Sequence, residues 1–473
     1  MRGSAAKRLA KYIVSEKLAL LPPDVGVKAK LCVQDSVGCL FGAHDTPVAR
    51  TMAEFSGDIA GCDGAKPDCS SIALVAATLI NALDYDDIYR KGHPGATVVS
   101  TALALASRIE CSGADLLEAV VVGYEVSGRV GMSLTHATPR KTVHGHGTWQ
   151  TMGAVATAAK LLRLDARQAA HAIAIAAANA PLASVMKTVY GASPSMAKNN
   201  FGAAAQAGVN AAFLARRGFE GPLDIFEGET GFWRMFGADD CDREQLTSGL
   251  GYAYEIREVG FKPYSCCRIL QSSIEAVVEL FRQAKIDPRT GSYQGILVSA
   301  PPIVCEAPFS NPHPTDMWSA QFSAPYTIAL GLLGVEPGPG WFTRQRLSDH
   351  ELRALAGKIE LRPYGAAADE KPSHHAASAE IRLDDGRLLK AEVKVAKGEA
   401  ANPIPEEVLD RKFLHLATAA IGPDASDRTL DSIKSLETAA TVRSLASGIL
   451  AAGALRGVQQ IRARLAPASE HMP

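Results

Sequence analysis

The hydrophobic positions in the first half of the chain recur at the spacing of amphipathic helices. The first such stretch carries Leu9, Tyr12, Ile13 and Leu18, and the prolines at 22 and 23 are expected to end it. The same spacing predicts helices over 24–40, 71–83, 96–109, 114–132, 151–162, 166–178 and 203–216. Gly, Pro and Asp occupy the connections between these stretches. We therefore expect the first half of the chain to form one helical domain.

The pattern changes after residue 261, where short strands alternate with helices. The elements predicted there are helices over 272–284 and 318–333 and strands over 295–300, 358–361, 379–383 and 388–395. The last two strands flank an Asp-Gly turn at 384–387, which is typical of a hairpin. After 402–405 the helical spacing returns and continues to 465.

These patterns predict a mainly α fold with two domains. A large all-helical domain is expected from both chain ends, over 1–260 and 403–473. The segment 261–402 is expected to form a smaller α+β domain that is inserted into, or docked on, the helical body.

Composition and charge argue against several kinds of partner. The 473 residues include 49 Lys and Arg against 50 Asp and Glu, so the net charge of -1 gives no reason to expect nucleic acid. The most apolar stretch, 72–83, is interrupted by Thr78 and Asn81 and is too short to span a membrane. Nine scattered cysteines without zinc-ligand spacing predict free thiols, and residues 1–21 lack a secretory-signal pattern. We expect a cytoplasmic protein without nucleic-acid or membrane partners.

The densest polar cluster, 83–95, lies between two apolar helices. It contains Asp84, Asp86, Asp87 and His93, which would be held on a short loop between rigid supports. From the residues alone, a solvated linker in which Asp86 or Asp87 caps a helix is slightly favoured over a catalytic site.

Three further clusters place cations or imidazoles beside helix starts or at the domain junction. His144 and His146 precede a helix, without a third metal ligand at a telling distance, so an anion site or a structural role are both open. Lys198 opens an Ala-rich helix, where the helix dipole disfavours a cation; a bound anion would relieve this conflict, and an exposed lysine is the alternative. Lys262 and Arg268 suit a carboxylate-rich substrate at the domain junction, or a linker with a structural arginine.

Taken in order, these clusters resemble the MmgE/PrpD family, which includes 2-methylcitrate dehydratase, cis-aconitate decarboxylase and iminodisuccinate epimerase. The resemblance covers nearly the whole chain, and its pieces are weak singly but specific together. They are Asn81-Ala-Leu-Asp-Tyr-Asp-Asp87 with His93-Pro-Gly95, Gly123-Tyr-Glu-Val126, His144-x-x-Gly-Thr148, Leu161-Leu-Arg-Leu164, Lys198, Leu214-Ala-Arg-Arg-Gly-Phe-Glu-Gly-Pro222, Phe226-Glu-Gly228, Phe261-Lys-Pro-Tyr264, Cys267-Arg268, Phe322-Ser323, the 384–387 turn and Asn402-Pro403.

The resemblance implies a helical body, an α+β lid over 261–402 and a homodimer. It places the active site between the domains and implies neither a metal nor an organic cofactor. Matched by position, the catalytic residues are Asp84, His93, His144 and Lys198. The substrate-binding residues are Lys262, Arg268, Cys267 and Tyr326.

The sequence departs from the decarboxylase-type members at three positions. Ile88 replaces a Thr, Cys267 replaces a His five residues after the lysine, and Gln271 often corresponds to a His. The loss of these polar groups makes cis-aconitate decarboxylation a less favoured expectation.

The chemistry that the resemblance implies is proton transfer next to a carboxylate. His93 and His144 are expected to share base and acid work, Asp84 to orient one imidazole, and Lys198, Lys262 and Arg268 to stabilise carboxylate and enolate charge. We expect a cofactor-independent lyase that dehydrates a hydroxy di- or tricarboxylate. Epimerisation, decarboxylation and a catalytically silent carboxylate-binding protein are the alternatives.

Overall fold

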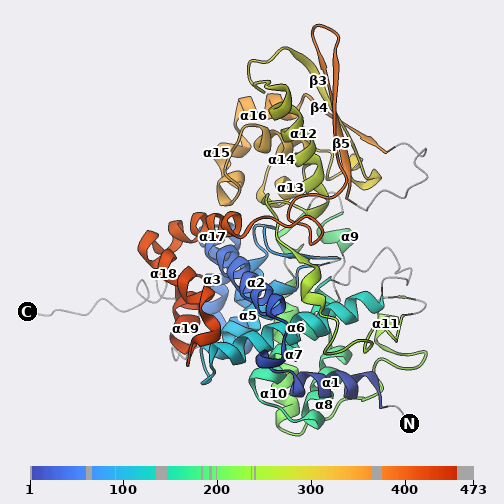
Figure 1. Ribbon diagram of the computed structural model, residues 1–473, viewed down its shortest axis with the longest axis vertical. Coiled ribbons are helices and arrows are strands. Elements are labelled where there is room, and N and C mark those ends of the chain that lie inside the picture. Colours follow the sequence, from blue (N-terminus) through green and yellow to red (C-terminus); the bar gives the residue numbers. More distant parts are fainter. Residues whose placement is uncertain are drawn as a thin grey trace, which may run out of the picture.

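A computed structural model describes residues 3–59, 67–90, 92–134, 146–182, 185–190, 194–198, 200–235, 237–238, 241–364 and 375–454. The predicted fold class is confirmed: the described chain is mainly α-helical, with one four-stranded sheet and one two-stranded ladder. Figure 1 shows most helices in one body and the larger sheet with its helices at the opposite end of the molecule. None of the helices in the described ranges has the length and apolar character needed to cross a membrane.

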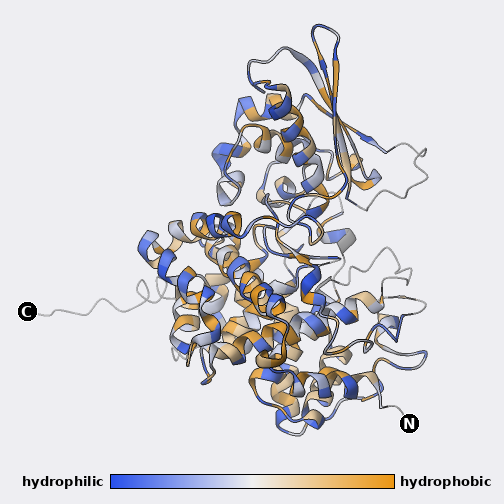
Figure 2. Ribbon diagram, in the orientation of Figure 1, coloured by the Kyte–Doolittle hydropathy of each residue, from blue (hydrophilic) through white to orange (hydrophobic). Residues whose placement is uncertain are grey.

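The helical body forms where the sequence has long stretches rich in alanine. Its helices up to residue 235 are α1 (Ala5–Ser15), α2 (Pro23–Gly42), α3 (Pro47–Ile59), α4 (Cys69–Ile80), α5 (Pro94–Ala106), α6 (Gly113–Ser133), α7 (His146–Leu161), α8 (Ala166–Ala178), α9 (Val185–Thr188), α10 (Phe201–Arg216) and α11 (Phe232–Met235). Small residues let these helices approach closely, since a Cβ added at Gly208 on α10 would lie 2.6 Å from the Cβ of Ala154 on α7. Figure 2 shows hydrophobic positions gathered in this body.

The two ends of the chain meet in the body. The C-terminal helices are α17 (Glu406–Ile421), α18 (Pro423–Lys434) and α19 (Arg443–Ala452). α17 packs on α2 and α19 packs on α5, so both chain ends contribute to one core (Figure 1). The exact domain limits, 1–260 with 403–473 and 261–402, stay a prediction.

The four-stranded sheet has the strand order β4-β3-β5-β6. Its strands are β3 (Tyr293–Ala300), β4 (Ile359–Pro363), β5 (Ala377–Leu383) and β6 (Leu388–Val393), with β3 parallel to β4 and the other pairs antiparallel. The predicted hairpin is confirmed, and Gly386 takes the positive φ of 87° that its turn requires. α12 (Gln271–Ala284) packs against β3, β5 and β6. The other helices of this part are α13 (Met317–Gln321), α14 (Ala324–Leu332), α15 (Arg344–Leu347) and α16 (His350–Ala356).

Two local expectations were wrong in detail, and one helix was not anticipated. α1 ends at Ser15, Leu18 lies in a separate 3₁₀ turn, and Pro23 starts α2 because proline at the first helical position costs no hydrogen bond. The single helix expected over 318–333 is two helices, since the Ser323 hydroxyl accepts the N–H of Tyr326 and caps α14. The helix α3 was not predicted.

A short ladder joins two segments that are far apart in the sequence. β1 (Ile88–Tyr89) pairs antiparallel with β2 (Val259–Gly260), with Ile88 opposite Gly260. The polar cluster at 83–95 therefore lies beside the segment that begins at Lys262.

Candidate active site

The turn that follows α4 presents Asp84 with a left-handed backbone. Its φ is 50°, a conformation that non-glycine residues adopt rarely and that needs support from the surroundings. Gln321 donates to the carbonyl of Ala82 at 2.8 Å, and Ser265 donates to the carbonyl of Leu83 at 3.0 Å. The turn is thus held by side chains from distant segments.

Two lysines share the carboxylate of Asp84. Lys262 Nζ donates to Asp84 Oδ1 and, at 2.7 Å, to the Asp84 carbonyl, while Lys198 Nζ lies 3.4 Å from Oδ2. Burial by itself would raise the pKa of Asp84, but the ammonium groups of Lys198 and Lys262 hold it well below its usual range. Asp84 is therefore ionised, and this group of three side chains carries one more positive than negative charge.

His93 immediately precedes α5, and Pro94 occupies the first position of that helix. Its Nδ1 lies 2.7 Å from the carbonyl oxygen of Asp87. Since a carbonyl can only accept, Nδ1 carries the proton, and Nε2 of the neutral ring keeps its lone pair. Burial lowers the pKa of His93 to about 3, and the Lys262 ammonium acts in the same direction. His93 is therefore a neutral base at physiological pH.

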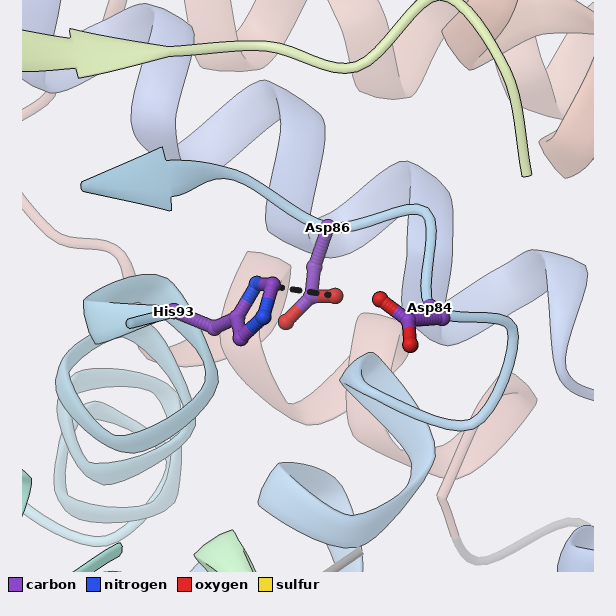
Figure 3. Close-up of side chains that lie close together, drawn as sticks. All are labelled: Asp84, Asp86 and His93. Atoms are coloured by element: carbon purple, nitrogen blue, oxygen red, sulfur yellow. Dashed lines mark ion pairs between the residues drawn. The ribbon is translucent and has the colours of Figure 1, made fainter. Parts of the chain in front are cut away.

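Asp86 lies between His93 and Asp84 (Figure 3). Its Oδ1 is 3.7 Å from His93 Nδ1, and Asn81 Nδ2 lies 3.0 and 3.1 Å from its two oxygens. Burial raises the pKa of Asp86 to about 6, and the Asp84 carboxylate acts in the same direction against the Lys262 ammonium. Asp86 can therefore change its charge near neutral pH.

Asp87 has the structural role that the sequence left open. Its carboxyl accepts the N–H of Gly95, in the first turn of α5, and the hydroxyl of Tyr124 at 2.7 Å. A Cβ at position 95 would lie 2.9 Å from Asp87 Oδ1, so only glycine permits this approach. The helix-capping interpretation thus holds for Asp87, whereas Asp84 and Asp86 face other partners.

The ligand atoms of Asp84, Asp86 and His93 lie within 4.8 Å of one another, close enough for a metal ion. The donors are otherwise engaged, however. Both Asp84 oxygens contact ammonium groups, and His93 Nδ1 donates to a carbonyl. A divalent cation would have to displace two lysines, so we do not assign these residues as metal ligands.

A cavity of about 250 Å³ opens over this cluster. Of the predicted site residues, the structure brings Asp84, His93, Lys198, Cys267 and Arg268 to it. Asn81 and Phe322, which the sequence analysis quoted only as parts of motifs, also line it. The remaining lining residues, which were not singled out, are Arg90, Gly92, Thr188, Val189, Tyr190, Asn200, Phe201, Ile269 and His375. Arg90 and Gly92 belong to the polar cluster at 83–95, and the others come from residues 188–201 and from the α+β part, where the local sequence does not indicate that they line a cavity.

Comparison with protein families matches residues 7–244 to the MmgE/PrpD N-terminal domain and residues 264–438 to the MmgE/PrpD C-terminal domain. The chain belongs to the MmgE/PrpD family. It is 26% identical to a cis-aconitate decarboxylase of Homo sapiens over 92% of both chains. It is also 25% identical to a cis-aconitate decarboxylase of Mus musculus (92% of this chain, 91% of the relative) and to a cis-aconitate decarboxylase-like protein of Aspergillus oryzae (94% and 96%).

Within this MmgE/PrpD chain, three of the residues expected to bind substrate have partners in the protein itself. Lys262 is fully buried beneath Asp84 and does not line the cavity. Tyr326 does not line it either, because its hydroxyl donates to the carbonyl of Trp341 at 2.5 Å. Arg268 lines the cavity, but its guanidinium donates to both oxygens of Glu399 and to the carbonyl of Arg90. All three contact other parts of the protein, and their expected role in substrate binding stays a prediction.

Only one of the three departures from the decarboxylase-type pattern touches the cavity. Ile88 is buried in β1, and Gln271 donates to the carbonyls of Tyr264 and Cys266. Cys267 lines the cavity, and burial together with the Asp84 carboxylate raises the pKa of its thiol to about 12. Cys267 therefore stays protonated and neutral.

His144 lies outside the described residues, so its expected role stays a prediction.

Lys412 on α17 was not anticipated: its ammonium donates to Asp35 at 2.7 Å and to the carbonyls of Tyr85 and Lys262 at 2.6 and 3.2 Å. Nothing in the local sequence distinguishes it from a solvent-exposed helix lysine.

Proposed function

We propose that this MmgE/PrpD protein is a cofactor-independent lyase that removes a proton next to a carboxylate of a small di- or tricarboxylate, with dehydration of a hydroxy acid as its reaction. One observation carries the proposal: a neutral imidazole protonated on Nδ1 lies beside a cavity whose charged cluster has a surplus ammonium group.

Lys198 is the proposed carboxylate-binding group. Asp84 already has Lys262 as its close partner, and the longer 3.4 Å contact leaves Lys198 able to meet a ligand anion in the cavity. Burial of 93% of Lys198 makes this ion contact stronger than it would be in water.

His93 is the proposed base. Burial is the largest cause of the low pKa of His93, and the ammonium groups of Lys262 and Lys198 add to it. A substrate carboxylate bound at Lys198 offsets the contribution of that ammonium group and so raises the basicity of Nε2. Substrate binding thereby makes His93 a stronger base than it is in the free protein.

The proposed step moves the proton from the carbon next to the carboxylate to His93 Nε2. The electron pair of the broken C–H bond becomes enolate charge, which Lys198 stabilises, and then forms the C=C bond as the hydroxyl leaves. The leaving hydroxyl takes up a proton and departs as water. We retain His144 as the proposed donor of that proton, and the Cys267 thiol as a neutral neighbour of the substrate.

Decarboxylation is a second candidate, favoured by relatives that match over more than nine-tenths of their length. Decarboxylation of an unsaturated acid breaks the bond to the leaving carbon dioxide and places a proton on carbon, so it needs a proton donor, whereas the neutral resting state of His93 is a proton acceptor. This difference favours proton abstraction, and hence dehydration or epimerisation, over decarboxylation.

The homodimer, the cytoplasmic location and the absence of nucleic-acid and membrane partners stay predictions.

The test is a proton NMR time course in D2O with EDTA, offering 2-methylcitrate, cis-aconitate and a panel of hydroxy- and aminodicarboxylates separately. A vinyl signal from a hydroxy acid supports dehydration, and deuterium wash-in without loss of substrate supports epimerisation instead. Release of carbon dioxide from cis-aconitate supports decarboxylation. His93→Asn should abolish the signal, while the exposed control His313→Asn should retain it; no turnover of any compound would support a silent carboxylate-binding protein.

A further inference from the structure

The cavity lining carries more positive than negative charge. Among the described residues that line it, the basic side chains are Arg90, Lys198 and Arg268, apart from two histidines, against the single carboxylate of Asp84. Lys198 is already proposed for one substrate carboxylate. The two arginines therefore decide whether the site can hold a second one.

Arg268 is occupied by protein groups. Its Nε donates to Glu399 Oε1 at 2.7 Å and its Nη2 donates to Oε2, a bidentate pair whose side chains are only 18% and 15% exposed. Its Nη1 donates to the carbonyl of Arg90. Arg268 therefore fixes the backbone of Arg90 and has little capacity left for a ligand.

Arg90 is held in place at the cavity by its backbone. Its φ is 30°, which is uncommon for a residue with a side chain. The N–H of Tyr89 donates to the carbonyl of Gly92 at 2.8 Å, and the N–H of Gly92 donates back at 2.6 Å. The turn is thereby closed on both sides of Arg90, directly before His93.

The guanidinium of Arg90 has a partner that is easily exchanged. It lies 3.2 Å from Glu258 Oε2, and the two side chains are 44% and 49% exposed. An ion pair this exposed contributes little, so a ligand carboxylate can replace Glu258 at small cost. Arg90 thus differs from Arg268, whose carboxylate partner is largely shielded from water.

We propose that Arg90 is the specificity-determining residue that binds a second substrate carboxylate while Lys198 binds the first. The site then takes compounds with at least two carboxylates and discriminates against monocarboxylates. This inference rests on the proposed function, because it takes Lys198 as the first carboxylate site.

The experiment measures the dissociation constants of two probes by NMR titration of the full-length protein. Tricarballylate has three carboxylates and no hydroxyl group to lose, and propionate has one carboxylate. The variants are Arg90→Gln, Lys198→Gln and the exposed control Arg387→Gln. We expect Arg90→Gln to raise the dissociation constant of tricarballylate at least fivefold and that of propionate less than twofold. Lys198→Gln should raise both dissociation constants at least fivefold, and Arg387→Gln should change neither.

The outcomes separate this inference from the proposed function. The inference is overturned if Arg90→Gln loses less than fivefold in affinity for tricarballylate, or twofold or more in affinity for propionate. In that case the result for Lys198→Gln can still support the proposed function. Undiminished binding in Lys198→Gln, or no binding of tricarballylate to the wild-type protein, overturns the carboxylate site itself. Glu258→Gln provides a further check, since freeing Arg90 from its partner should leave tricarballylate binding unchanged or tighter, and weaker binding would contradict the exchange.

Discussion

Lys412 Nζ lies 2.6 Å from the carbonyl oxygen of Tyr85, although 327 positions of chain separate the two residues. The same ammonium contacts Asp35 and the carbonyl of Lys262, and it lies 3.8 Å from the centre of the Tyr85 ring. One buried side chain from the C-terminal helix α17 therefore joins the turn that presents Asp84 to the segment that carries Lys262.

Replacement of this lysine should lower both stability and activity. Lys412→Met leaves the Asp35 carboxylate buried without its cation, and we expect the free energy of unfolding to fall by about 3–5 kcal/mol. The measurement is urea unfolding of the wild type and the variant.

The double variant Asp35→Leu with Lys412→Met separates the effect of Lys412 on protein stability from its effect on the positions of Asp84 and Lys262. Removal of both charges should recover much of the stability, because no buried carboxylate is left unpaired. The turnover rate should stay low, since the carbonyls of Tyr85 and Lys262 still lack their donor. Full recovery of the rate together with the stability would show that Lys412 has no positioning role.

The two lysines on Asp84 should differ in what their removal affects. Lys262 is fully buried, makes two contacts with Asp84 and does not line the cavity, so Lys262→Met should cost about 3 kcal/mol of stability. Lys198→Met breaks only the longer contact and should cost about 1 kcal/mol while removing carboxylate binding. Urea unfolding and titration with tricarballylate measure the two effects, and equal losses of stability would contradict this division.

The structure shows which of these roles a sequence can reveal. His93 and Lys198 could be found because they lie in short polar stretches beside apolar helices, where local pattern and resemblance coincide. Lys262 was found too, but its role as the buried partner of Asp84 depends on the β1–β2 pairing across more than 160 residues. The sequence did not indicate that Lys412 is buried or that Arg90 lines the cavity, since both properties depend on how distant segments pack.

The neutral, largely buried His93 should make the stability of the protein depend on pH. The unfolded chain binds a proton near the ordinary pKa of 6.5, whereas the folded protein binds it only near pH 3. The stability that this difference contributes is fully present above pH 6.5 and is lost as the pH falls, by about 1.4 kcal/mol per pH unit. Between pH 7 and pH 5 the wild type should therefore lose about 2 kcal/mol more than His93→Asn does. Urea unfolding at the two pH values tests this, and parallel losses would show that His93 is not held neutral.

Protonation of Asp86 should cause the fall of the reaction rate at the acidic end of the pH profile. When His93 takes a proton, a negative charge on Asp86, 3.7 Å from Nδ1, stabilises the imidazolium. Because the pKa of Asp86 is raised to about 6, this carboxylate is ionised above that pH and protonated below it. The value of kcat/KM, which reports on the free enzyme, should therefore fall as the pH drops through about 6. Asp86→Asn should lower kcat/KM at pH 8 by at least tenfold and remove the limb near pH 6, while the exposed control Asp385→Asn should keep the wild-type profile. A limb that persists in Asp86→Asn would assign that titration to another group, and would leave Asp86 only its structural bond with Asn81.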